Sequence, residues 1–284
     1  MTDHYAVFGN PIAHSKSPLI HRAFAEQTAQ DMGYEAILAA REGFTEALEQ
    51  FKAAGGRGAN VTLPFKEEAY RYATQRTTRA EQAGAVNTLR FDGLETLGDN
   101  TDGVGLVQDL QVNLNFALGG QSILLLGAGG AARGVIGPLL AACPARLFIA
   151  NRTAHKAHAL ATRFKTLYAP LSPLFPLSPS TRIDSGSFAE TQGQTFDLIL
   201  NATSASLENT CPSLPSRVFA AGSLAYDMMY GQGETAFLAM AKAQGAARLA
   251  DGLGMLVEQA AEAFFVWRGV RPSSSALLHR LRTQ

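Results

Sequence analysis

Cysteine is scarce in this chain, which has only Cys143 and Cys211 among its 284 residues. Two thiols in a chain of this length make neither a disulfide framework nor the clustered ligand spacing of a zinc site. We therefore expect two reduced cysteines in a cytoplasmic protein, Cys143 on a packed helix and Cys211 in a loop. We expect no metal site. His14, beside a serine motif, is expected to line a pocket, and the other histidines, His21 among them, are expected on the surface or on helix faces.

The chain also lacks an excess of charge and a long uninterrupted apolar run. It has 24 Lys and Arg against 24 Asp and Glu. Without a basic field there is no reason to expect nucleic acid or an anionic membrane as partner, so a small molecule is the better expectation. The most apolar region, residues 123–150, is broken by glycines, arginines and prolines. We expect neither a membrane span nor a signal peptide.

What the chain has is an alternation of short apolar segments with amphipathic ones, which is typical of an α/β protein built on a parallel sheet. Strands are expected at residues 4–9, 34–39, 58–63, 84–91, 94–99, 122–127, 146–150, 196–203 and 223–228. Helices are expected at residues 17–27, 43–54, 103–110, 252–268 and 273–283, with others between the later strands. Ser17 is the expected N-cap of the first helix, because Pro18 suits the first helical position. Residues 168–187 are rich in proline and serine, and we expect an irregular surface segment there.

A glycine turn joins the expected strand at 122–127 to the following helix, in the stretch LLLGAGGAARGV. Gly127, Gly129 and Ala132 form the pattern G-x-G-x-x-A, in which small residues let the backbone and the helix N-terminus approach a pyrophosphate. Because the pattern lies between a strand and a helix, it predicts a dinucleotide site. The residues expected at the phosphates are Gly127, Ala128, Gly129, Gly130 and Ala131.

The end of the next strand indicates which dinucleotide is bound. An enzyme selective for NAD usually has an acidic residue here for the ribose hydroxyls. This chain instead has Asn151, Arg152 and Thr153, followed by Lys156. A guanidinium can hold a 2′-phosphate with two hydrogen bonds, whereas a carboxylate would repel it. The predicted cofactor is therefore NADP(H).

Longer motifs run through the whole chain. They are GNPIAHSKSP (9–18), GANVTLPFKEEA (58–69), AGAVNT (83–88), GDNTDG (98–103), GAGGAAR (127–133), NRT (151–153), NATS (201–204), YDMMY (226–230) and ADGLGMLVEQA (250–260). Their order and content resemble the shikimate dehydrogenase family over nearly the full length. The resemblance implies NADPH-dependent reduction of 3-dehydroshikimate to shikimate, in the chorismate route to aromatic amino acids.

The resemblance also implies a domain organisation. Residues 1–102 and 252–284 would form the substrate domain, and residues 103–251 would form an inserted NADP-binding Rossmann domain. It implies nothing definite about assembly, so a monomer or a homodimer is expected.

Individual site residues are likewise implied by the resemblance. The hydroxyls of Ser15 and Ser17 would bind the substrate carboxylate, with the Tyr230 phenol nearby. The ring hydroxyls of the substrate would contact Thr62, Asn87, Asp102 and Gln259. Met228 and the backbone of Gly252 would lie near the nicotinamide.

Lys66 matches the catalytic lysine of the family, and Asp102 matches its partner. Hydride transfer to a ketone builds negative charge on the oxygen, so a proton donor must lie within hydrogen-bond reach. An ammonium group supplies the proton, and a neighbouring carboxylate would hold it charged and oriented. Glu67 and Glu68 suit the first turn of a helix that begins beside Lys66.

The chain departs from the family pattern in two loops. It has NATSAS at residues 201–206 where the family often has NATSxG, and Thr78, in the expected loop TTRA (77–80), replaces a frequent acidic residue. Neither departure touches Lys66 or Asp102. Two alternatives remain open: a relative that also oxidises quinate with NAD, and an NADP-binding module without catalysis. The basic stretch at 151–156 opposes the first, and the presence of Lys66 with Asp102 opposes the second.

Overall fold

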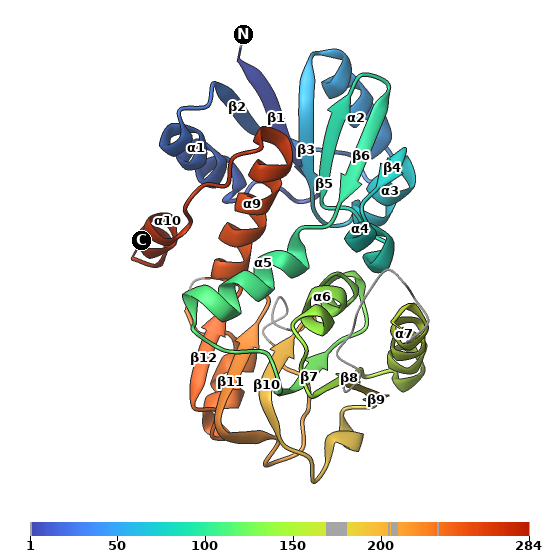
Figure 1. The fold of residues 1–284 in the computed structure, drawn as a ribbon, viewed down its shortest axis with the longest axis vertical. Coiled ribbons are helices and arrows are strands. Elements are labelled where there is room, and N and C mark those ends of the chain that lie inside the picture. The colour runs from blue at the N-terminus through green and yellow to red at the C-terminus, as the bar shows by residue number, and fades with distance from the viewer. Residues whose placement is uncertain (1, 169–180, 204, 206–209, 232, 284) are drawn as a thin grey trace. The chain divides into compact units, whose positions relative to one another are not determined.

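The computed structural model describes residues 2–168, 181–203, 205, 210–231 and 233–283 (Figure 1). The chain divides into two compact units. Unit 1 comprises Met1–Leu106 and Leu256–Gln284, and unit 2 comprises Val107–Met255. The chain thus leaves unit 1 after Leu106 and returns at Leu256. The expected domain boundaries were four residues earlier in each case, after residue 102 and before residue 252.

Unit 1 is a mixed sheet flanked by helices. Its strands are β1 (Asp3–Gly9), β2 (Met32–Leu38), β3 (Gly56–Val61), β4 (Gln75–Arg76), β5 (Thr88–Asp92) and β6 (Glu95–Asp99). They lie in the order β2-β1-β3-β5-β6-β4. Its helices are α1 (Ser17–Thr28), α2 (Phe44–Ala53), α3 (Lys66–Tyr72), α4 (Thr78–Ala83), and, from the end of the chain, α10 (Ser275–Arg282). Helices α5 (Asp102–Gln108) and α9 (Leu253–Arg268) carry the chain from one unit to the other.

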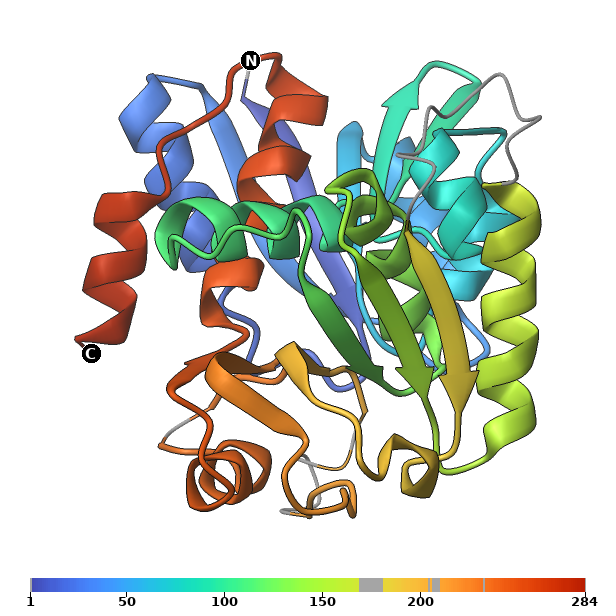
Figure 2. The same ribbon diagram turned by 60° about the horizontal axis from the view of Figure 1, so that its bottom comes forward.

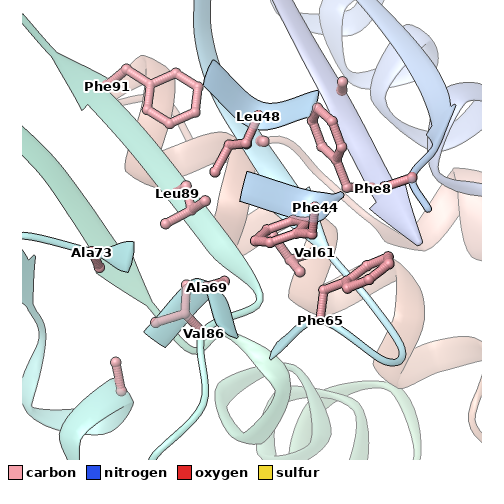
Figure 3. Close-up of a cluster of buried hydrophobic side chains, with 14 residues drawn as sticks. Phe8, Phe44, Leu48, Val61, Phe65, Ala69, Ala73, Val86, Leu89 and Phe91 are labelled. Carbon is pink, nitrogen blue, oxygen red and sulfur yellow. The ribbon is translucent and has the colours of Figure 1, made fainter. Parts of the chain in front are cut away.

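A cluster of buried aromatic and aliphatic side chains fills one face of the unit 1 sheet (Figure 3). The rings of Phe44 and Phe65 stack with their centroids 4.9 Å apart, and the ring of Phe8 packs edge-on against Phe44. Phe65 is 2% exposed, and burial of a ring of this size stabilises its position by about 1.5–3 kcal/mol. The cluster therefore anchors the residue that directly precedes α3 and Lys66.

Unit 2 is a parallel six-stranded sheet, seen in Figures 1 and 2 as a row of adjacent arrows. Its strands are β7 (Ser122–Leu126), β8 (Arg146–Ala150), β9 (Arg182–Gly186), β10 (Phe196–Asn201), β11 (Phe219–Asp227) and β12 (Arg248–Asp251). Its helical elements are a π-helix (Asp109–Asn113), α6 (Gly130–Ala141), α7 (Ala154–Leu167), a 3-10 turn (Ala189–Thr191) and α8 (Ala236–Ala243). In Figure 2, α7 runs alongside the gold strand β9.

The strand order of unit 2, β12-β11-β10-β7-β8-β9, is that of a dinucleotide-binding Rossmann sheet. The order reverses between β7 and β10, and ligands of such sheets bind outside the carboxyl ends of the strands at this reversal. The predicted α/β class is confirmed. Within the described residues, no helix is long and apolar enough to cross a membrane.

Several expectations about local structure are wrong. Lys16, not Ser17, occupies the N-cap position of α1, and Ser17 is the first helical residue. The strand expected at 84–91 begins only at Thr88, because Gly84 ends α4 in the left-handed conformation. The expected loop at 77–80 is the start of α4, where the Thr77 hydroxyl accepts a hydrogen bond from the Ala80 N–H as a true N-cap.

Other corrections concern burial and the proline-rich segment. Strand β9 lies within the expected irregular segment 168–187, whose residues 169–180 are outside the described part of the chain. His21 is not on the surface: it is 0% exposed. Cys143 is exposed and lies beyond the end of α6 with a positive φ of 55°, rather than on a packed helix.

Candidate active site

Lys66 is the first residue of α3 and lies two residues after Pro64, whose peptide bond with Leu63 is cis. Its side chain is 27% exposed, so its stem is held while its ammonium can reach a ligand. Nζ lies 2.6 Å from Oδ2 of Asp102, whose side chain is 11% exposed. The two predicted catalytic residues, from separate segments of unit 1, are thus in direct contact.

Asn87 is the centre of the hydrogen-bond network around this pair and is 2% exposed. Its side-chain nitrogen lies 2.9 Å from Oδ1 of Asp102 and 3.2 Å from Oε1 of Gln259. Asp102 therefore accepts from Asn87 through one oxygen and from Lys66 through the other. Each oxygen of the carboxylate thus has a donor, which fixes its orientation toward the ammonium.

Ser15, Ser17 and Thr62 belong to the same unit. The Ser17 N–H donates to Oγ of Ser15 over 3.3 Å, and the Thr62 N–H donates to the Phe8 carbonyl over 2.9 Å. Ser17 is 7% exposed, whereas Ser15 and Thr62 are half-buried. Their predicted contacts with a substrate stay predictions.

A chain of buried polar groups connects Ser17 to Asn87. The Tyr34 phenol donates to Oδ1 of Asn60 over 2.8 Å, and the Asn60 amide donates to the Asn87 carbonyl over 3.1 Å. Burial raises the pKa of Tyr34 well above its usual range, and a hydrogen bond with the Ser17 hydroxyl offsets this in part. The hydrogen bonds from Tyr34 through Asn60 to Asn87 thus connect polar groups of this region.

Sequence reasoning missed Tyr34 and Asn60 as members of this region. Asn60 could have been found, because it is a polar residue inside the apolar strand GANVTL, and a buried amide needs partners. Tyr34 gives no such signal, since tyrosine is common in strands.

The glycine turn of unit 2 follows β7. Gly127 has a φ of 111°, and an added Cβ would lie 3.1 Å from the Ala202 carbonyl, so only glycine fits this turn. Gly129 is the N-cap of α6, and Gly130 is its first residue. Gly129, Gly130 and Ala131 are exposed, and their predicted contacts with a pyrophosphate stay predictions. Ala128 is half-buried beside them.

The basic stretch after β8 lies at the carboxyl end of the neighbouring strand. The Asn151 amide donates to the Thr153 carbonyl over 3.0 Å, which shapes the turn into α7. Arg152 and Lys156 are both exposed. They follow β8, which pairs with the glycine-turn strand β7, and their predicted contact with a 2′-phosphate stays a prediction.

Met228 and Gly252 lie together in unit 2. The Gly252 N–H donates to the Met229 carbonyl over 3.0 Å, and an added Cβ on Gly252 would lie 2.2 Å from the Met228 carbonyl oxygen. The buried Asp227 carboxylate accepts from the Met229 N–H over 3.1 Å and so fixes the Met228 turn. Tyr230 follows half-buried, and burial raises its pKa.

The loop that departs from the family pattern at 201–206 is only partly described. Asn201 accepts from the Thr203 hydroxyl over 2.7 Å, while residues 204 and 206 are outside the described part. Over the same described residues, His, Cys, Asp and Glu form no group of three or more that could hold a metal ion.

Known protein families match most of the chain. Residues 7–89 match the shikimate dehydrogenase substrate binding domain, residues 110–178 match the shikimate / quinate 5-dehydrogenase family, and residues 252–282 match the shikimate 5'-dehydrogenase C-terminal domain. These matches fall in both units and in the returning C-terminal segment.

Named relatives agree with these matches. The chain is 64% identical to a shikimate dehydrogenase (NADP(+)) of Dechloromonas aromatica, covering 100% of this chain and 99% of the relative. It is 56% identical to the enzyme of the same name from Nitrosospira multiformis, covering 100% and 98%. A crystal structure of shikimate 5-dehydrogenase from Thermus thermophilus, in complex with NADP(H) and shikimate, has a TM-score of 0.84 at 32% identity and covers 99% of each chain. The chain belongs to the shikimate dehydrogenase family, as its motifs predicted.

Proposed function

We propose that this chain catalyses the reversible NADPH-dependent reduction of 3-dehydroshikimate to shikimate, with Lys66 as general acid and base and Asp102 as its partner. The names of the relatives support the reaction and the cofactor. The observation that carries the mechanism is the 2.6 Å contact between Nζ of Lys66 and Oδ2 of Asp102. This contact supports the proposed pairing, because an ammonium and a carboxylate lie together in the unit that contains the match to the substrate binding domain.

The chemistry requires one proton and one hydride. NADPH, when bound, supplies the hydride to the carbonyl carbon. The Lys66 ammonium stabilises the negative charge on the carbonyl oxygen and donates its proton to it. The resulting neutral amine regains a proton from solvent, and in the oxidative direction the amine accepts the proton of the hydroxyl. Asp102 would orient Nζ of Lys66 through the contact between them.

Hydroxyl and amide side chains of unit 1 would bind the substrate. Ser15 and Ser17 would donate to its carboxylate, with Tyr230 as a further contact. The amides of Asn87 and Gln259 and the hydroxyl of Thr62 would contact its ring hydroxyls. The hydrogen bonds that join Asn87 to Asp102 and to Gln259 support this assignment, because they make one continuous polar cluster.

Unit 2 would bind NADP(H). The turn from Gly127 to Ala131 would hold the pyrophosphate, and Arg152 and Lys156 would hold the 2′-phosphate, with Asn151 and Thr153 shaping their turn. Met228 and the backbone of Gly252 would border the nicotinamide. The absence of room for a side chain at Gly127 and Gly252 supports both assignments. We expect the protein to act in the cytoplasm, as a monomer or a homodimer, without nucleic acid or membrane.

Absorbance at the reduced-nicotinamide band, with shikimate plus NADP⁺, tests the proposal. Lys66→Ala should lower turnover roughly 10²–10⁴-fold, because a general acid contributes about this much. Its affinity for NADPH should stay near that of the parent. Lys52→Ala is the matched control, since Lys52 contacts Thr96 and the Phe91 ring rather than Asp102. Turnover of Lys66→Ala within about tenfold of the parent would mean that the proton comes from another group.

Quinate is the second candidate substrate, because the family matched by residues 110–178 carries both names. Arg152 and Lys156 favour NADP over the NAD expected of a quinate enzyme. Rates with quinate against shikimate, each with NAD and with NADP, separate the two. A module that binds NADP without catalysis would show affinity for the dinucleotide and no rate with either acid.

A further inference from the structure

Asp99 is a buried carboxylate at the end of β6 that the proposed mechanism leaves without a role. It is 2% exposed. It lies three residues before Asp102, in the turn DNTD that joins β6 to α5. A buried charge is costly unless it is paired and hydrogen-bonded, so its partners indicate what it does.

Arg79, on α4, is the main partner of Asp99. Its Nε and Nη2 lie 2.6 and 2.5 Å from the two oxygens of Asp99, a two-pronged ion pair. Its remaining nitrogen, Nη1, lies 2.9 Å from Oε1 of Glu262 on α9. Burial by itself would lower the pKa of Arg79, but the hydrogen bonds and charges of the two carboxylates raise it above its usual value.

The Asp99 carboxylate continues into the turn that carries Asp102. It accepts from the Asn100 N–H over 2.7 Å, and the Asn100 side-chain oxygen accepts from the Asp102 N–H over 3.2 Å. Asn100 is 1% exposed and also donates to the Ala85 carbonyl over 3.1 Å. The backbone of Asp102 is therefore connected to Asp99 through two hydrogen bonds.

The other end of Arg79 leads to Gln259. Glu262 lies three residues after Gln259, on the same helix α9. Arg271 holds Glu262 by a second ion pair, so this carboxylate has a cation on each side. Gln259 in turn lies 3.3 Å from the Thr101 hydroxyl and 3.2 Å from the Asn87 amide.

We propose that Arg79 is a positioning residue of the proposed reaction, on which this inference rests. It joins the turn that carries Asp102 to the helix that carries Gln259. Two segments far apart in the sequence are thereby held in register around Asn87. Arginine suits this task because its planar fork binds one carboxylate with two nitrogens and still has a third for another, whereas lysine offers a single charged nitrogen.

Arg79→Lys tests the proposal in the full-length enzyme, with shikimate and NADP⁺. We expect kcat to fall roughly 10–100-fold, because a displacement of about 1 Å at a reacting group costs this much. The KM for NADP⁺ should stay within about twofold, since Arg79 lies outside the unit that carries the dinucleotide residues. Arg90→Lys is the matched control: it makes the same change in an exposed ion pair with Asp92 and should leave both constants within about twofold.

A double variant distinguishes positioning from general destabilisation. If Arg79 acts through the Lys66–Asp102 pair, Arg79→Lys lowers the residual rate of Lys66→Ala by less than about twofold. The same fold loss in the parent and in the Lys66→Ala background overturns the proposal. If the parent is active and Arg79→Lys has the same kcat as the parent, the proposal is also overturned. A parent without shikimate-dependent reduction of NADP⁺ refutes the proposed function itself, and with it this role.

If Arg79→Lys does not fold, Glu262→Gln tests the positioning role of Arg79 instead. This change keeps an oxygen near Arg79 and removes only the charge that holds the Gln259 helix. We expect the KM for shikimate to rise about threefold to tenfold with a smaller change in kcat, the range for weakening the charge-assisted hydrogen bonds that Arg79 and Arg271 make to this carboxylate. A Glu262→Gln enzyme with the kcat and KM of the parent overturns the proposal.

Discussion

The burial of His21 predicts how the stability of the fold changes with pH, and it gives a magnitude for the change. It is 0% exposed on α1, and its ring stacks on Tyr34 with centroids 4.2 Å apart and planes 13° apart. Phe24, Phe264 and Trp267 surround the remaining faces. Burial lowers the pKa of His21 from 6.5 to about 3, and the neighbouring Asn60 side chain opposes the shift only in part.

The sign of the effect on stability follows from the depressed pKa. Above pH 6.5 His21 is neutral in both the folded and the unfolded chain, so it has no effect. As the pH falls below 6.5, His21 becomes protonated in the unfolded chain, whereas in the folded chain it stays neutral until about pH 3. The free energy of unfolding then falls by about 1.4 kcal/mol per pH unit, which makes about 2 kcal/mol at about pH 5.

Urea unfolding of the parent and of His21→Phe, each at about pH 7 and about pH 5, measures this term. Trp267 is the only tryptophan of the chain, and its ring lies 5.2 Å from that of His21, so its fluorescence reports the unfolding of unit 1. His279→Gln, at an exposed position of α10, is the control. Other groups titrate alike in all three proteins. If the parent and His21→Phe lose the same stability within about 0.5 kcal/mol, His21 does not titrate as its burial requires.

Three further variants test the predicted cofactor site, the packing of unit 2 and the orientation of Asp102. Arg152→Ala should raise the KM for NADPH about 10–100-fold more than that for NADH, because hydrogen bonds to a charged group contribute about 1.5–3 kcal/mol; a parallel rise would refute phosphate recognition there. Gly254→Ala should lower the free energy of unfolding of unit 2 by about 1–3 kcal/mol in a urea melt, because its Cβ would lie 2.0 Å from Oδ1 of the buried Asp109. An unchanged melt contradicts this. Asn87→Leu should reduce kcat for shikimate about tenfold or more, because Oδ1 of Asp102 loses its donor; a kcat near the parent's would mean that Lys66 alone orients Asp102.

Local patterns predicted much of the fold because they depend on neighbours in sequence. The apolar run before Gly127 and the small residues after it predicted a strand, a turn and a helix, and β7, Gly127 and α6 follow in that order. The pattern around Lys66 was also local: an apolar strand, a proline, and a helix that begins at Lys66 itself. The family was identified from such motifs and is confirmed by the relatives.

The parts that sequence reasoning missed depend on partners far away in the chain. Nothing near Arg79 indicates that Glu262 will meet it, and nothing near His21 indicates that Tyr34 and Trp267 will enclose it. Helical spacing places His21 on a face of α1, but which face is covered depends on β2 and α9. Strand β9 was missed because its sequence, RIDSG, has only one large apolar residue and follows a segment rich in turn formers.

The return of the chain to unit 1 at Leu256 has a consequence for biosynthesis. On the ribosome, Lys66, Asn87 and Asp102 emerge early, yet Gln259, a hydrogen-bond partner of Asn87, is 172 residues further on. All of unit 2 must be translated in between, so unit 2 of a nascent chain can fold while unit 1 still lacks most of α9. The hydrogen-bond network around Asn87 consequently cannot be complete before unit 2 has been translated.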